Sequence, residues 1–192
     1  MSKMSAAEPP QGANSAPSGG SEAAKPRASG DHILNLDQLE GGRELRHRDR
    51  FDATLAPVGS RIGARQLGYN VTTVAPGKRA FPFHNHHVNE ELFFVLEGEG
   101  TLRLGSDEHR VRKGDFVCCP AGGPAHQFIN TGTSPLRYLA VSTMVDSDVW
   151  HYPDSKKFGV IAGRDPSRAP ADASFPSRFV PDDVGVGYWH GE

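Results

Sequence analysis

The sequence predicts an all-β fold, either a barrel or a sandwich. From residue 65 to residue 144 the chain is a series of short segments rich in β-branched and aromatic residues, most of them ending in turns of Gly, Pro, Asp or Ser. No segment in this range has the apolar period of an amphipathic helix. Many short strands separated by turn residues are typical of β-sandwiches and β-barrels.

The expected strands follow one another along the chain. They cover residues 65–74, 91–97, 101–104, 109–112, 116–119, 125–130 and 136–144. Gly98 and Gly100 bracket the tight turn of the central hairpin, because glycine adopts backbone angles that other residues avoid. We therefore expect one β-domain over residues 65–145.

The flanking segments have a different composition. Residues 1–30 are rich in Ala, Ser, Gly and Pro and contain no aromatic residue, which predicts a disordered tail. Residues 31–64 are expected to form an N-terminal arm that packs on the barrel without joining its central sheet. Residues 146–192 are aromatic but irregular, and their rings would be costly to leave in water. This C-terminal extension is expected to cover the barrel or a neighbouring subunit, which favours a homodimer.

Charge and composition exclude several classes of protein. The net charge of −2 argues against a nucleic-acid binder, which is normally basic. No apolar run is long enough to span a bilayer, and the N-terminal residues lack the apolar core of a secretory signal. Cys118 and Cys119 are adjacent, so on a strand they point apart and are expected to be free thiols in a reducing compartment. We expect a cytoplasmic protein that binds neither nucleic acid nor membrane.

The stretch "PFHNHHVNEELFFVLEGEG" at residues 82–100 concentrates the titratable side chains. His84 and His86 are two residues apart, so on an extended chain they point the same way and His87 points the other way. Glu91 opens the next strand, and if it faces inward then Glu90 faces out. Two imidazoles and a carboxylate that converge suit a divalent transition metal.

His126, which follows the "PAGGP" loop, offers a fourth donor to the same site. Three imidazoles and one carboxylate suit Fe, Mn, Ni, Cu or Zn. The alternative is a metal-free polar network inside the barrel, which would be costly because the groups would lack partners. Both possibilities place the same four side chains, His84, His86, Glu91 and His126, at one site.

Two motifs resemble those of the cupin family. The first comprises Gly77, His84, His86, Glu91 and Gly98, and the second comprises Gly114, Pro120, Gly123, His126 and Asn130. The first has one extra residue before His84, and the second has one extra residue before Gly123. The resemblance covers about residues 65–145. It implies a double-stranded β-helix, or jelly roll, with a metal held by His84, His86, Glu91 and His126.

The resemblance leaves the reaction open. It allows a metal-dependent enzyme acting on a small molecule, either an oxygenase or a sugar or sugar-phosphate isomerase. It also allows a non-catalytic metal- or metabolite-binding protein, or a structural protein. An oxygenase predicts an apolar pocket. A sugar-phosphate enzyme predicts Lys or Arg in the pocket, and Lys78 and Arg79 are candidates. The expected pocket residues are Gln66, Tyr69, Phe83, Phe93, Gln127 and Phe128, with Phe81 as further aromatic lining.

Overall fold

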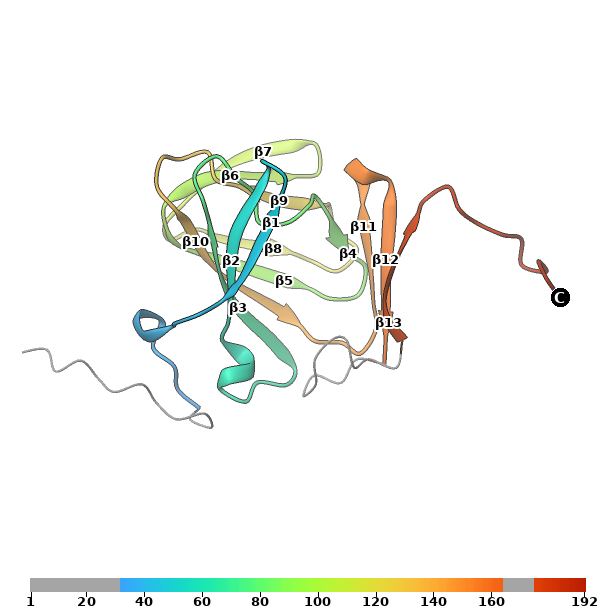
Figure 1. The fold of residues 1–192 in the computed structure, drawn as a ribbon, viewed down its shortest axis with the longest axis horizontal. Coiled ribbons are helices and arrows are strands. Elements are labelled where there is room, and N and C mark those ends of the chain that lie inside the picture. Colours follow the sequence, from blue (N-terminus) through green and yellow to red (C-terminus); the bar gives the residue numbers. More distant parts are fainter. Residues whose placement is uncertain (1–31, 164–174) are drawn as a thin grey trace, which may run out of the picture.

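The structure is a computed structural model, and it describes residues 32–163 and 175–192. The fold is all-β, as the sequence predicts, and its paired strands are antiparallel (Figure 1). Three short 3-10 helices complete it: η1 at Leu36–Gln38, η2 at Gly59–Arg61 and η3 at Pro153–Ser155. Among the described residues, no helix has the length and apolar character that crossing a membrane requires.

The first wall of the barrel is a six-stranded sheet in the order β1-β2-β3-β10-β5-β8. Its strands are β1 (Arg43–His47), β2 (Phe51–Pro57), β3 (Leu67–Val74), β10 (Leu136–Thr143), β5 (Glu91–Glu97) and β8 (Phe116–Cys119). In β5, Phe93 and Val95 are buried while Leu92 is 37% exposed. Glu91 has the parity of Phe93 and therefore faces the barrel interior, as the alternation in the sequence predicts.

The second wall consists of two shorter sheets that meet at the candidate site. One has the order β7-β6-β9 and the other β13-β12-β11-β4. Their strands are β7 (Asp107–Arg112), β6 (Glu99–Leu104), β9 (His126–Ile129), β13 (Phe175–Pro181), β12 (Lys157–Ala162), β11 (Asp148–Tyr152) and β4 (Asn85–His86). An isolated antiparallel bridge between His84 and His126 connects the edge at β4 to β9.

The hydrophobic core lies between the two walls. The largest contributors from the first wall include Val74, Val95 and Leu136, each fully buried. Leu102 of β6 and Phe128 of β9 meet them from the second wall. Apolar burial on both inner faces is what holds a two-walled β-fold together.

The structure corrects the prediction that residues 31–64 stay outside the central sheet. β2 pairs with β3, with Ala53 opposite Val74, and β1 pairs with β2 at the edge of the same sheet. The sequence does not reveal β1 as a strand because four of its five side chains are exposed and all four are charged or polar, as is common on an open sheet edge.

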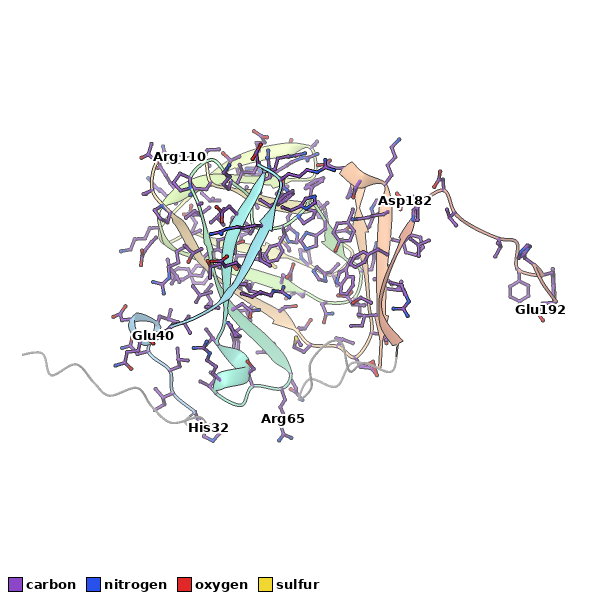
Figure 2. The ribbon with its side chains drawn as sticks, in the orientation of Figure 1. His32, Glu40, Arg65, Arg110, Asp182 and Glu192 are labelled. Carbon is purple, nitrogen blue, oxygen red and sulfur yellow. The ribbon has the colours of Figure 1, made fainter. Side chains whose placement is uncertain are left out.

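The structure also corrects the prediction that residues 146–192 are irregular. Strands β11, β12 and β13 occupy much of this range and stand together beside the barrel in Figure 1. The turn at Pro153 divides β11 from β12, so each run was too short to show a clear period. Beyond Asp182 the chain extends away from the barrel towards Glu192, with Tyr188 and Trp189 exposed (Figure 2).

The structure of a single chain over these residues does not test two further predictions, the disordered tail and the homodimer. The disordered tail at residues 1–30 falls outside the described residues. The homodimer stays a prediction, which a measurement of molecular mass in solution would check.

Substitution at Gly98 tests the geometry of the central hairpin. Gly98 has φ +77°, and a Cβ there would collide with the Pro135 carbonyl, whereas Gly77 has φ +74° and open space around it. We expect Gly77→Ala to cost about 1–2 kcal/mol through backbone strain alone. Gly98→Ala should cost above about 3 kcal/mol because the collision adds to the strain. Urea unfolding of both variants measures the difference, and equal costs would contradict the packing at Pro135.

Candidate metal centre

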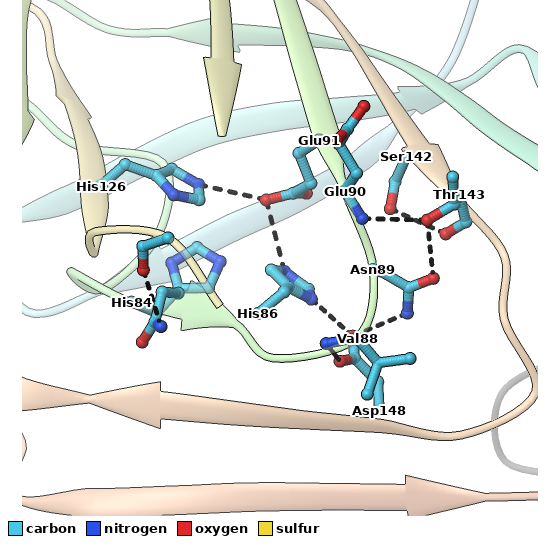
Figure 3. Close-up of polar contacts among 12 residues, drawn as sticks. His84, His86, Val88, Asn89, Glu90, Glu91, His126, Ser142, Thr143 and Asp148 are labelled. Carbon is cyan, nitrogen blue, oxygen red and sulfur yellow. Dashed lines mark hydrogen bonds and ion pairs between the residues drawn. The ribbon is translucent and has the colours of Figure 1, made fainter. Parts of the chain in front are cut away.

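Three side chains converge at one end of the barrel interior. The candidate ligand atoms of His84, His86 and Glu91 all lie within 4.8 Å of one another (Figure 3). His86 belongs to β4, His84 lies just before it, and Glu91 is the first residue of β5. His87 and Glu90 are exposed, as strand alternation predicts.

His126 enters the site from the neighbouring strand. Its backbone forms a reciprocal pair with His84, with N···O distances of 3.2 Å and 2.7 Å, and the two ring centroids are 4.8 Å apart. His126 Nε2 lies 3.1 Å from Glu91 Oε2. His126 is not in the three-residue group, so the structure brings it to the carboxylate without placing it equally close to both other histidines.

The outer nitrogens of two histidines are held by acceptors. His84 Nδ1 lies 2.8 Å from the Pro82 carbonyl oxygen, and His86 Nδ1 lies 2.6 Å from Asp148 Oδ2. A carbonyl oxygen and a carboxylate oxygen can only accept, so in both neutral rings the proton sits on Nδ1. Nε2 of His84 and His86 is then unprotonated and available as a metal ligand.

The donor set fits a bound cation. Glu91 Oε2 is buried, makes no well-directed hydrogen bond, and lies 3.3 Å from His86 Nε2. With the proton of His86 on Nδ1, these two atoms face each other as acceptors. Such a contact inside a protein is unfavourable unless a proton or a cation lies between the atoms. Imidazole and carboxylate donors in this arrangement match a divalent transition metal.

The electrostatics keep the ligands in their metal-binding forms. Burial and the neighbouring His126 lower the pKa of His84 to about 4, so this imidazole is neutral at physiological pH. Burial alone would raise the pKa of Glu91, but the contacts with His126 and His86 outweigh it and lower that pKa. The carboxylate is therefore ionised. Metal binding needs neutral imidazoles and an ionised carboxylate.

A cavity of about 260 Å³ adjoins the four side chains. Its remaining lining is aromatic, aliphatic or neutral polar: Phe81, Phe93, Phe128, Tyr138, Trp150, Tyr152, Leu55, Ala140, Asn70, Thr72 and Gln127. No Lys or Arg is among the described residues that line it. The cavity is therefore largely apolar, with a few neutral hydrogen-bonding groups.

Three of the six residues expected in the pocket line this cavity, namely Phe93, Gln127 and Phe128, and Phe81 joins them. Gln66, Tyr69 and Phe83 do not line it, which corrects their expected placement. The inward residues of β3 are Asn70 and Thr72, so Tyr69 takes the opposite face, and Gln66 is exposed ahead of the strand.

Phe83 has the opposite parity to His84 and lies under a cation. The Arg103 guanidinium carbon is 3.7 Å from the centroid of the Phe83 ring. This buried ring therefore belongs to the outer packing of the wall, where a cation–π contact holds it.

Sequence reasoning missed the contribution of β11. Asp148 contacts His86, the Tyr152 ring stacks on His84 at 5.6 Å, and the Trp150 ring meets His86 edge-on at 6.1 Å. The spacing of Asp148, Trp150 and Tyr152 is that of one strand face, which is the pattern that could have identified them.

The fold and the site together define a jelly-roll β-barrel with a candidate transition-metal centre. A family model described as "Cupin domain" matches residues 70–142. Over residues 70–142 the chain is therefore similar to a cupin domain.

Solved structures share this fold over most of the chain. The "Putative sugar phosphate isomerase" of Acidithiobacillus ferrooxidans is 27% identical, with a TM-score of 0.68 over 81% of this chain and 96% of that chain. A sugar phosphate isomerase of the cupin superfamily from Silicibacter pomeroyi is 24% identical, with a TM-score of 0.66 over 81% of this chain and 97% of that chain. The second likeness shows the fold alone.

Similarity to curated proteins is confined to a shorter segment. The "Oxalate-binding protein" of Thermotoga maritima is 34% identical over 58 residues, which are 30% of this chain and 47% of that protein. The chain spans less than half the length of the curated relatives that it matches.

The lowered pKa of His84 predicts how acid affects the metal-free protein. His84 has a pKa of about 4 in the folded protein and about 6.5 when unfolded, so between these values the unfolded chain binds more protons. The neutral His84 ring therefore makes its full contribution to the free energy of unfolding above pH 6.5. Between pH 6.5 and pH 4 the free energy of unfolding falls by up to about 1.4 kcal/mol per pH unit because of this group.

His84→Gln should flatten this dependence. Urea unfolding of chelator-treated protein across that pH range measures the slope. His87→Gln, a change at the exposed histidine that directly follows His86, is the matched control and should leave the slope as it is. An unchanged slope in His84→Gln would contradict the assignment.

Proposed function

We propose that this protein is a metal-dependent cupin enzyme that acts on a small, phosphate-free organic molecule, with oxygenase-type chemistry. The observation that carries the proposal is the cavity beside His84, His86 and Glu91, whose lining is aromatic and neutral. Each part of the proposal rests on a separate feature of this site.

The lining argues for a phosphate-free ligand. A phosphate group is normally held by Arg or Lys side chains or by backbone N–H groups at a helix N-terminus. Neither Lys78 nor Arg79 is among the cavity-lining residues, and the Lys78 ammonium donates to the Asp49 carbonyl at 2.7 Å. The cavity instead offers aromatic faces and the side chains of Asn70, Thr72 and Gln127, which suit an uncharged, oxygen-bearing molecule.

The ligand set argues for oxygenase-type chemistry. Two histidines and one carboxylate that leave open positions are the arrangement of non-haem iron oxygenases. A bound metal would supply redox or Lewis-acid chemistry to a ligand oxygen. The chain's own residues would hold the ligand against the aromatic wall, and Trp150 and Tyr152 of β11 would limit access of water to it.

A second candidate is a sugar isomerase, which the likeness to the Acidithiobacillus ferrooxidans protein favours. Isomerisation needs a proton-transfer group beside the metal. His126 is the residue placed to serve, because it lies outside the three-residue ligand group and its Nδ1 has no hydrogen-bond partner. Under the first candidate His84, His86 and Glu91 hold the metal and His126 contacts the Glu91 carboxylate, whereas under the second candidate His126 serves as the base.

Two non-enzymatic alternatives make different demands on the site. A structural metal would be enclosed by four protein ligands, with no space for a further molecule. The cavity of about 260 Å³ beside the candidate ligands is better suited to binding a small molecule. A non-catalytic binding protein would use the same cavity, so measured turnover separates it from an enzyme.

Metal content tests the ligand assignment. We expect the purified protein to carry about one transition-metal equivalent per chain, and His86→Ala or Glu91→Ala to remove most of it, because each variant deletes a ligand. His87→Ala and Glu90→Ala change neighbouring residues of the same types that face solvent, so they should retain the metal. Elemental analysis gives the stoichiometry, and full metal retention in both site variants would contradict the assignment of His86 and Glu91 as metal ligands.

Trp150 provides a direct test of the ligand class. The chain has two tryptophans, of which Trp150 lines the cavity and Trp189 is 76% exposed in the tail. In a Trp189→Phe protein, we expect small phosphate-free molecules to change the remaining fluorescence and some of them to stimulate oxygen uptake by the iron-loaded protein. Sugar phosphates and inorganic phosphate should do neither. Saturable binding and isomerisation of a sugar phosphate would instead establish the second candidate.

A further inference from the structure

Asp148 is a nearly fully buried carboxylate beside the candidate metal centre, with 1% of its surface exposed. It is the first residue of β11, so it lies outside the segment that matches the cupin domain. Its Oδ2 accepts from His86 Nδ1 at 2.6 Å and from Asn89 Nδ2 at 2.7 Å. A buried carboxylate is costly unless hydrogen bonds satisfy it, and here they do.

The second carboxylate oxygen of Asp148 binds the backbone of two segments, the one that follows His86 and the start of β11. Asp148 Oδ1 accepts from the Val88 N–H at 3.2 Å and from its neighbour Val149 N–H at 2.9 Å. Val88 and Asn89 lie in the connection between His86 and Glu91. One side chain therefore fixes both the ring of His86 and the segment that leads to the carboxylate ligand (Figure 3).

A second set of bonds anchors the same connection to the first wall. Asn89 Oδ1 accepts from Thr143 Oγ1 at 3.0 Å and from the Val145 N–H at 2.9 Å, and Thr143 Oγ1 accepts from the Glu90 N–H at 2.9 Å. The polar chain runs from the end of β10 through Asn89 and Asp148 to His86. Its direction is set, because an ionised Asp148 can only accept.

We propose that Asp148 is a positioning residue for the metal centre: by accepting the Nδ1 proton of His86 it keeps Nε2 of that ring free to bind the metal. The inference rests on the proposed function, since it takes His86 to be a ligand. It assigns part of the site to the C-terminal sheet, so the cupin domain alone does not complete the centre. Acceptors that hold the outer nitrogen of a ligand histidine fix its tautomer and its orientation.

The tautomer of His86 tests the inference without any metal. In chelator-treated wild-type protein at mildly alkaline pH, nitrogen NMR should show the neutral His86 ring protonated at Nδ1. In Asp148→Asn the new amide can turn its NH₂ group to Nδ1, which favours the Nε2-protonated form, as the same exchange does in an Asp–His pair of serine proteases. His84, which the Pro82 carbonyl holds, should keep its tautomer in both proteins.

The affinity for Zn²⁺ alone tests the consequence. We expect competition against a chromophoric chelator to show a loss of about 10- to 100-fold in Asp148→Asn. Asp146→Asn is the matched control, because Asp146 is exposed and its carboxylate accepts a hydrogen bond from the neighbouring Ser147 hydroxyl. The control should bind Zn²⁺ as the wild type does.

The possible outcomes separate the inference from the proposed function. Weaker Zn²⁺ binding without a change of tautomer would show that Asp148 acts on the fold and not through His86, which overturns the inference. Wild-type affinity in folded Asp148→Asn would overturn it as well, while leaving the metal centre intact. If Asp148→Asn does not fold, the wild-type spectrum decides, because an Nε2-protonated His86 would contradict the inference. Failure of the wild type to bind Zn²⁺ would instead remove the metal centre itself.

Discussion

The contact between the Glu91 carboxylate and the surrounding imidazoles is the constraint on which the rest of the site depends. Glu91 Oε2 lies 3.3 Å from His86 Nε2 and 3.1 Å from His126 Nε2, inside a largely apolar cavity. This cluster is expensive to bury, because the unprotonated Nε2 of His86 and the Glu91 carboxylate face each other as acceptors. A divalent cation among these atoms would turn the same contacts into favourable coordination, so the unfavourable contact between His86 and Glu91 is itself an argument for a bound cation.

The strand pairing supplies what this cluster requires. His84 and His126 lie opposite each other in an antiparallel pair, so their rings emerge side by side on the inner face of the second wall. The two-residue strand β4 then places His86 against Trp150 of β11. Backbone hydrogen bonds thus hold the rings in position, and the interior does not have to rely on side-chain packing alone to fix their spacing.

Strand alternation explains why most of the candidate site could be predicted from the sequence. A period of two separates His84 and His86 from His87, and the hydrophobic run behind Glu91 separates it from Glu90. The contribution of Asp148 could not be predicted in this way. Asp148 lies on β11 and its partner His86 on β4, and the pairing of these two strands joins segments far apart in the sequence. Pairing between distant strands is set by the whole fold and leaves little local trace.

The remaining errors concern the pocket walls. Gln66 and Tyr69 lie in a segment whose register nothing in the sequence fixes, so parity alone does not place them. Phe83 directly precedes His84, and its opposite parity points its ring away from the site. In β3 the cavity receives Asn70 and Thr72, and Pro82 lies between Phe81, which lines the cavity, and Phe83, which does not. Parity is informative only where a residue of known orientation anchors it, as Phe93 does for β5. The metal motif contains such residues of known orientation, whereas the segment with Gln66 and Tyr69 does not.

The charges of the site bear on what the cavity can select. Glu91 and Asp148 are held ionised by their lowered pKa values, and the lowered pKa of His84 keeps that ring neutral. A divalent cation would balance the two carboxylates, so the loaded centre would present little net charge to a ligand. Arg103, the cation that stacks on Phe83, is engaged by Asp154 through two hydrogen bonds of 2.6 Å and 2.9 Å. Selection would then depend on the aromatic walls and the neutral polar groups, which discriminate by shape and by hydrogen bonding more than by charge.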